Sequence, residues 1–235
     1  RVNVFKQRGT LASVMRALPF EIPEPDKLGI PPEVVAVTEK KRGLVLVTGT
    51  AGSGKSTTLA CIIDTINHHY RKHIITLENP LEFLHRHDLS IVSQREINVD
   101  TESYVTALRA SLRQSPDVIL LGEMRDYETM QVAMTAAETG HLIFSTLHTI
   151  GAASTIDRII DVFPPNQQHQ IAVQLSMVLN AVISQQLVPT VDGQMVPAFE
   201  IMSVTPAIRN MIRDNKVHQI DGLIATSAKD DMISM

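Results

Sequence analysis

Residues 49–56 read Gly-Thr-Ala-Gly-Ser-Gly-Lys-Ser, which fits the pattern G-x4-G-K-[ST] of a phosphate-binding loop. An apolar run at residues 44–48 precedes this segment, and residues 56–70 carry leucine and isoleucine at helical spacing. A strand, a glycine-rich turn and a helix in this order let backbone N–H groups and the start of the helix face a phosphate. The segment therefore predicts that a buried parallel strand leads directly into a helix.

The same segment predicts a site for a nucleoside triphosphate. Lys55 is expected to reach the β- and γ-phosphates, and Ser56 is expected to ligate Mg²⁺. Glycine allows backbone conformations and a close approach that a Cβ atom would block. The residues expected to bind the nucleotide are Thr50, Ala51, Gly52, Ser53, Gly54, Lys55, Ser56 and Thr57.

Three further short apolar runs follow, at residues 74–77, 118–121 and 142–145. Helical stretches lie between the last two pairs of runs, around residues 103–113 and 129–139. Strands that alternate with helices predict an α/β fold with a mostly parallel sheet covered on both faces. In such sheets, ligands bind beyond the carboxyl ends of the strands.

A residue that can handle a proton follows each of these three strands. Glu123 is the predicted general base, which would position a water in line with the γ-phosphate, and it is also a candidate Mg²⁺ ligand. Glu78 can hold Mg²⁺ through water or help to position the nucleophile, or it can be an ordinary turn acid before a proline. His148 can sense the γ-phosphate by hydrogen bonding, or it can be structural.

Two other polar residues belong at the opposite edge of the predicted sheet. Asp117 comes just before its strand, so it lies about 20 Å from Glu123 along an extended chain. We expect Asp117 to cap the start of that strand. His141 also precedes its strand and is expected to lie far from the nucleotide.

The regions outside this core have different patterns. Residues 1–5 and 10–17 predict strands, because apolar and polar residues alternate in them. Five prolines crowd into residues 19–32 and predict an extended linker, after which a short amphipathic helix is expected near residues 33–38.

The C-terminal part predicts mostly helix. Residues 162–191 contain no charged side chain, but six glutamines, a histidine, two asparagines and three prolines favour a buried or interface-packed helix over a membrane span. Ile171, Leu175, Val178 and Val182 recur at helical spacing. Thr205 and Pro206 predict the cap and first turn of another helix, and residues 226–235 are expected to be frayed.

Composition excludes several classes of function. The formal net charge is 21 − 25 = −4, which argues against a chain-wide electrostatic grip on nucleic acid. Aromatic residues make up only 4% of the chain and tryptophan is absent, so base-stacking platforms are not expected. Cys61 is the single cysteine, which excludes an internal disulfide and a zinc site built from several cysteines.

Four segments together resemble the secretion ATPase superfamily, which powers type IV pili and type II secretion. They are the glycine-rich loop, the Glu78 segment, Gly-Glu-Met-Arg-Asp at 122–126 and Thr-Gly-His-Leu-Ile-Phe-Ser-Thr-Leu-His-Thr at 139–149. They look like the Walker A, Asp, Walker B and His boxes of that superfamily. Two features resemble its pilus retraction branch: Ala-Ile-Arg-Asn-Met-Ile-Arg at 207–213, close to the motif AIRNLIRE, and the lack of the four-cysteine site that assembly ATPases usually carry.

The resemblance implies an architecture and a set of partners. Residues 1–18 would be the remnant of an N-terminal PAS-like α+β domain, residues 19–32 a linker, and residues 33–235 a RecA-like ATPase domain with C-terminal helices. The family implies a homo-hexameric ring in the bacterial cytoplasm, at the inner face of the membrane, that works on an inner-membrane platform protein. Arg1 and Arg16 match the positions of family arginines that contact the phosphates across a subunit interface.

The function implied is an ATP-hydrolysing motor for pilus retraction, and one departure keeps alternatives open. The Asp box usually reads Glu-Asp-Pro, but Asn79 replaces the aspartate here. A nucleotide-gated adaptor with weak or no hydrolysis is therefore one alternative, and a pilus-assembly or type II secretion ATPase is another. A DNA-remodelling motor with the same loop is a third, which the acidic balance disfavours.

Overall fold

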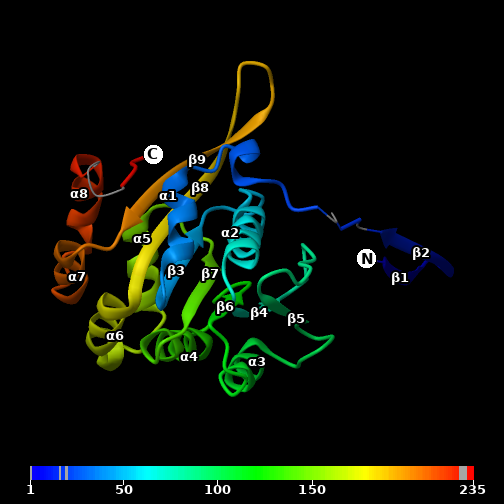
Figure 1. Ribbon diagram of the computed structural model, residues 1–235, viewed down its shortest axis with the longest axis horizontal. Helices are drawn as coiled ribbons and strands as arrows, with labels where there is room; N and C mark the ends of the chain where they lie inside the picture. Colours follow the sequence, from blue (N-terminus) through cyan, green and yellow to red (C-terminus); the bar gives the residue numbers. More distant parts are fainter. Residues whose placement is uncertain (1, 16, 19–20, 228–231) are drawn as a thin grey trace.

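A seven-stranded sheet with the order β5-β4-β6-β7-β3-β8-β9 forms the centre of the chain (Figure 1). The computed structural model describes residues 2–15, 17–18, 21–227 and 232–235. Adjacent strands are parallel, except that β9 runs antiparallel to β8. The predicted α/β fold with a mostly parallel sheet is therefore confirmed. The strands are β3 (Gly43–Thr48), β4 (His73–Glu78), β5 (Ile91–Glu96), β6 (Val118–Leu121), β7 (Leu142–Leu147), β8 (Leu179–Pro189) and β9 (Met195–Ser203).

Helices cover both faces of this sheet. One face packs against α1 (Pro32–Val35) and α2 (Lys55–His69). The other face packs against a larger set of helices: α3 (Tyr104–Ser111), α4 (Tyr127–Glu138), α5 (Ala152–Asp161), α6 (Pro165–Val178), α7 (Pro206–Arg213) and α8 (Ile220–Thr226). Because both faces are covered, the central strands are continuous apolar runs rather than alternating ones.

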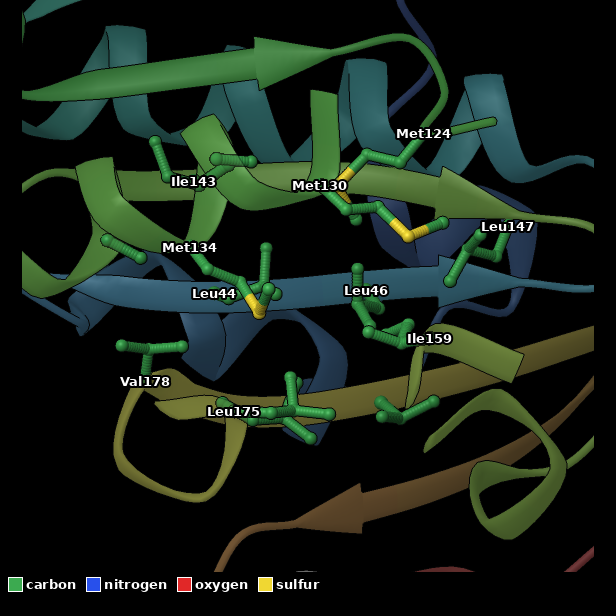
Figure 2. Packing of buried hydrophobic residues seen from close by; sticks show 14 of the residues in the cluster. Leu44, Leu46, Met124, Met130, Met134, Ile143, Leu147, Ile159, Leu175 and Val178 are labelled. Atoms are coloured by element: carbon green, nitrogen blue, oxygen red, sulfur yellow. The ribbon is translucent and has the colours of Figure 1, made fainter. Parts of the chain in front are cut away.

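Strand β3 shows how the two cores are divided. Leu44 and Leu46 point into the core beneath α4 and α6, whereas Val45 and Val47 point into the core beneath α2. In Figure 2, Leu44 and Leu46 lie among side chains of α4 and α6, such as Met134 and Leu175. Burying one such side chain contributes about 1.5–3 kcal/mol. The strand that leads into the glycine-rich loop is thus held firmly from both sides.

The N-terminal predictions are largely confirmed. The two expected strands are β1 (Val2–Gln7) and β2 (Thr10–Met15), which pair antiparallel in a separate two-stranded sheet. The linker is broken by one short 3-10 turn, Pro25–Leu28, and α1 continues into a 3-10 turn, Ala36–Glu39. The division into domains at residues 18 and 32 stays a prediction.

The helix predicted across residues 162–191 is wrong in its second half. Helix α6 ends at Val178, and β8 begins with the next residue. Val182 pairs in register with Leu46 of β3 instead of lying on a helix. A short apolar run fits a buried strand as well as a buried helix, so its spacing alone could not decide. Within the described ranges, none of the helices combines the length and apolar character needed to cross a membrane.

Besides β8, two further strands and one terminal contact were not predicted. Strand β5 was missed because it is an edge strand with several polar residues, paired only with β4. Strand β9 was missed together with the hairpin that joins it to β8. The expectation of a frayed end is wrong for residues 232–235, because Ile233 and Ile201 exchange two backbone hydrogen bonds of 2.8 and 3.0 Å. Buried Met232 anchors the same segment to the larger core.

Candidate active site

A cavity of about 280 Å³ lies at the carboxyl ends of β4, β6 and β7, beside the glycine-rich loop. This is the edge at which the sequence predicts a ligand. The cavity lies between the start of α2 and the segments that follow these three strands. Its lining comprises Ala51, Gly52, Lys55, Ser56, Glu78, Asn79, Pro80, Glu82, Tyr104, Gly122, Glu123, Arg125, Thr146 and His148.

The glycine-rich loop is clamped between α2 and β8. A Cβ atom on Gly49 would collide with the carbonyl oxygen of Gln185, and one on Gly54 would lie 2.8 Å from the Gln185 side-chain nitrogen. Both glycines have positive φ angles, 143° and 89°. The Gln185 side chain also accepts a hydrogen bond of 2.7 Å from the Thr58 hydroxyl. Only glycine fits these two places, so close packing against Gln185 shapes the loop.

Lys55 contributes a buried cation to the lining of the cavity. The residue is only 8% exposed. Its Nζ donates hydrogen bonds to the carbonyl oxygens of Gly49 and Thr50, at 2.9 and 2.7 Å. Burial lowers the pKa of Lys55, and the negative charges of Glu123 and Glu82 partly oppose that shift. A buried ammonium held by neutral carbonyls suits an anionic ligand, because a phosphate would stabilise its charge.

Glu123 and His148 meet at the same point in the cavity. The Glu123 side chain is 14% exposed, and its Oε2 lies 2.7 Å from Arg125 Nε and 3.5 Å from His148 Nε2. The Arg125 and His148 side chains are both well exposed. The carboxylate is therefore held by two side chains that can move away without disturbing the core. Such a carboxylate can exchange these partners for a water molecule.

Glu78 is the second acid of the cavity, and like Glu123 it is half-buried. Its Oε1 accepts a hydrogen bond of 2.6 Å from the Thr76 hydroxyl and one of 3.5 Å from the Gln94 amide. Burial raises the pKa of Glu78, and these two hydrogen bonds and the nearby charge of His85 counteract the rise. Asn79, which replaces the usual aspartate, also lines the cavity. A buried acid with a raised pKa is typical of functional sites.

The residues that could hold Mg²⁺ share this cavity. Ser56, Glu78 and Glu123 all line it. Within the described ranges, no group of three or more His, Cys, Asp or Glu side chains is arranged to hold a metal. Mg²⁺ commonly binds through one or two protein oxygens together with waters and substrate phosphates. The hydroxyl and carboxylate oxygens present fit that kind of binding.

A sequence profile decides the family of this chain. The profile described as "Type II/IV secretion system protein" matches residues 14–227. The chain belongs to this family. Its fold and its glycine-rich loop agree with the resemblance noted in the sequence.

Individual relatives agree with this membership. The chain is 49% identical over 226 residues to the type IV pilus retraction ATPase PilT of Pseudomonas aeruginosa, a match that covers 96% of this chain and 66% of the relative. It is 48% identical over 236 residues to a twitching motility protein of Neisseria gonorrhoeae, with 100% and 63% covered. The chain thus spans about two thirds of the length of these curated relatives.

A solved structure extends the likeness to three dimensions. A crystal structure of the pilus retraction motor PilT with bound ADP superposes with a TM-score of 0.92 at 50% identity. The superposition covers 100% of this chain and 71% of that one. Nucleotide binding is therefore a property of a family member with the same fold.

Other predicted residues fall outside the cavity. Arg1 and Arg16 lie outside the described residues, so their expected contacts with phosphate stay predictions. Asp117 lies at the distant edge as expected, but it does not cap its own strand, β6: its Oδ2 accepts a hydrogen bond of 2.9 Å from the backbone N–H of His73, at the start of the neighbouring strand β4. His141 lies at the same distant edge and bonds with the Ala136 carbonyl at 3.0 Å.

A second groove of about 540 Å³ adjoins the predicted nucleotide site. It shares Gly52, Lys55 and Ser56 with the cavity and is also lined by Ala17 and Leu18. A larger groove of about 770 Å³ lies beside the C-terminal half of α2 and the linker, and it contains none of the predicted site residues.

Sequence reasoning missed three residues of the site. Arg125 lies within the quoted Gly-Glu-Met-Arg-Asp segment, so its closeness to Glu123 could have been noticed. Tyr104 comes from the start of α3, and Gln185 comes from the strand that was mistaken for helix. No local pattern marks either of these two, because only the packing of distant segments brings them to the loop.

Proposed function

We propose that this chain is the ATP-hydrolysing part of a motor that powers type IV pilus retraction. The observation that carries the proposal is the cavity in which buried Lys55 and Glu123 lie together beside the glycine-rich loop. Identity of 49% to a pilus retraction ATPase supports the biological role. The nucleotide-dependent activity follows from the site, and the role in retraction follows from the likeness.

In this proposal, the side chains divide the chemistry of hydrolysis. Residues 50–57 bind the phosphates through backbone N–H groups, and Lys55 stabilises the charge on the transferred phosphoryl group. Glu123 orients the attacking water and takes up its proton, while His148 contacts the same carboxylate and can report on the γ-phosphate. Glu78 lies beside the nucleophile as a second acid. Mg²⁺, held by Ser56 and Glu123, would neutralise phosphate charge.

The mechanical part of the proposal needs a ring. Six copies would bind ATP between domains, with Arg1 and Arg16 reaching the phosphates of a neighbouring subunit. Binding would close one domain on its neighbour, and hydrolysis with product release would reopen it. At the cytoplasmic face of the inner membrane, these movements would act on a platform protein and remove pilin subunits.

Helix α7 is the proposed coupling surface. Its inner face is fixed, because Ile208 and Ile212 are buried and Arg209 donates hydrogen bonds to the Ser176 and Met177 carbonyls at 2.5 and 2.8 Å. Arg213 lies on its exposed side. Deleting residues 207–213 would therefore damage the core, and a surface substitution gives a cleaner experiment.

Phosphate release tests the enzymatic part. In the full-length protein, steady-state release is compared with that of a Glu123→Gln variant, beside the oligomeric mass of both. We expect release by the unmodified protein and its near loss in the variant. Equal rates would remove Glu123 from the mechanism.

Pilus retraction tests the motor part. An Arg213→Glu variant is expected to hydrolyse ATP normally but to abolish retraction, whereas Lys72→Glu, at the far edge of the sheet, is expected to change neither. Normal retraction by the Arg213 variant would refute the coupling role of α7.

Asn79 keeps a second candidate function open. If the missing acid is needed to hold Mg²⁺, the chain would bind ATP as an adaptor that docks on another motor. An Asn79→Asp variant distinguishes the two. A large gain in phosphate release would favour the adaptor, and an unchanged rate favours the motor.

A further inference from the structure

Tyr104 places a hydroxyl group in the cavity that the nucleotide chemistry described above does not use. It is the first residue of α3, directly after Ser103, whose hydroxyl caps the helix by accepting a hydrogen bond from the Thr106 N–H. The Tyr104 ring packs against the larger core, and the residue lines the cavity with Glu78 and Glu123. The ring is thus fixed by packing while its polar end faces the site.

Distances from the position that a Cβ atom on Gly122 would occupy show where the Tyr104 hydroxyl lies. A Cβ atom added to Gly122 would lie 2.8 Å from the Tyr104 oxygen, 3.3 Å from the Leu77 carbonyl oxygen and 3.4 Å from the Glu78 Cα. The hydroxyl therefore lies between the carboxyl ends of β4 and β6. Glu78 is the last residue of β4, and Glu123 comes two residues after the end of β6.

The hydroxyl is available for a ligand. Among the residues that the structure describes, none makes a hydrogen bond with the Tyr104 hydroxyl. Burial raises the pKa of Tyr104, and the charges of Glu123 and Glu78 raise it further, so the phenol keeps its proton. A neutral phenol can donate one hydrogen bond and accept another.

We infer that the Tyr104 hydroxyl is a further catalytic residue, which hydrogen-bonds the attacking water beside Glu123. The inference rests on the proposed function. In the step, the water oxygen bonds to the γ-phosphorus, and the bond to the bridging oxygen breaks with its electron pair left on ADP. One water proton passes to Glu123, and the Tyr104 oxygen accepts a hydrogen bond from the other. Two fixed partners hold the water in line better than one.

Tyr104→Phe is the direct test, because it removes the hydroxyl and keeps the ring. We expect kcat for ATP hydrolysis to fall about tenfold, which is the effect of one hydrogen bond made in the transition state. KM for ATP and the melting temperature are expected to stay unchanged. A kcat equal to that of the unmodified protein, or a change confined to KM, would overturn the inference.

Tyr127→Phe is a matched control. Tyr127 is also the first residue after a helix cap, Asp126, but it packs edge-to-face on Phe163 at 6.1 Å and does not line the cavity. Removing the Tyr127 hydroxyl is expected to leave kcat unchanged. A similar fall in both variants would assign the Tyr104 effect to helix stability and overturn the inference.

The Glu123→Gln variant distinguishes a failure of the proposed function from a failure of the Tyr104 inference alone. If the unmodified protein releases phosphate no faster than this variant, the proposed function and the role of Tyr104 fail together. If hydrolysis depends on Glu123 but not on Tyr104, only the inference fails.

A double-mutant cycle tests the position of the hydroxyl without any activity. Gly122→Ala is expected to lower the melting temperature less in the Tyr104→Phe background than in the unmodified protein, because the closest atom to the added methyl group is then gone. An equal loss in both backgrounds would show that the hydroxyl lies elsewhere, and it would overturn the inference.

Discussion

Strand β6 has an acid near each of its ends, and the two acids have opposite surroundings. Asp117, before the strand, is bonded to the His73 backbone at 2.9 Å and lies 3.3 Å from the Lys72 ammonium. Glu123, after the strand, is less exposed, and among the described residues its ion pairs are with the exposed side chains of Arg125 and His148. A carboxylate bonded to backbone braces a sheet, whereas one held by exposed side chains is free to exchange partners.

The two lysines differ in the same way. Lys72 has an exposed partner of opposite charge at the far edge, while Lys55 is buried against neutral carbonyls. Similar residue types thus serve structure at one edge of the sheet and chemistry at the other. The edge on which a residue lies decides between these two roles, because the backbone N–H groups at the start of α2 lie at the carboxyl ends of the strands.

The acids provide the largest test of this comparison. Glu123→Gln is expected to lower the rate of phosphate release by about 10²–10⁴-fold, because it removes the group that orients and deprotonates the water. Asp117→Asn is expected to leave that rate unchanged and to lower the free energy of unfolding by about 1 kcal/mol, measured in urea. An equal loss of activity in both variants would abolish the distinction between the two edges.

The lysines are expected to give the next largest effect. Lys55→Ala should weaken ATP binding about 10–100-fold, since hydrogen bonds to charged groups are worth about 1.5–3 kcal/mol. Titration with a fluorescent ATP analogue measures this affinity. Lys72→Ala is the matched control and is expected to bind normally, and weaker binding by that variant would contradict the comparison.

Two histidines, one at each edge of the sheet, provide a finer test of the same comparison. His148→Gln is expected to lower kcat about tenfold, because it removes one contact that orients Glu123. His141→Gln, whose ring meets the Ala136 carbonyl at the far edge, is expected to leave kcat unchanged. Steady-state phosphate release checks both, and a kcat unaffected by the His148 change would make that residue structural.

The smallest effect concerns stability and pH. The pKa of Glu78 is raised above its ordinary 4.5 by burial, so the folded protein binds more protons there than the unfolded chain. The stability that this group contributes is present at low pH and is lost as the pH rises through the folded-state pKa.

A Glu78→Gln variant removes that dependence. Its unfolding free energy relative to the unmodified protein is therefore expected to increase as the pH rises above 4.5, measured by urea unfolding at several pH values. A difference that is constant with pH would contradict the raised pKa.

The sequence predicted the parts of this protein that depend on neighbours along the chain. The glycine-rich loop, α2 and the acids at the ends of β4 and β6 were predictable because a buried strand, a turn and a helix cap are local features. Thr205 and Pro206 were recognised as the start of α7 for the same reason, and the Thr205 hydroxyl caps the Ile208 N–H.

Only the tertiary structure decided the rest. Residues 179–182 fit a helix as well as a strand, and pairing with β3 made them a strand. Likewise, nothing near Tyr104 in the sequence brings it to Gly122, or Gln185 to the glycine-rich loop. The physical reason is that such contacts arise from the packing of whole layers, whose energy is shared among segments far apart in the chain.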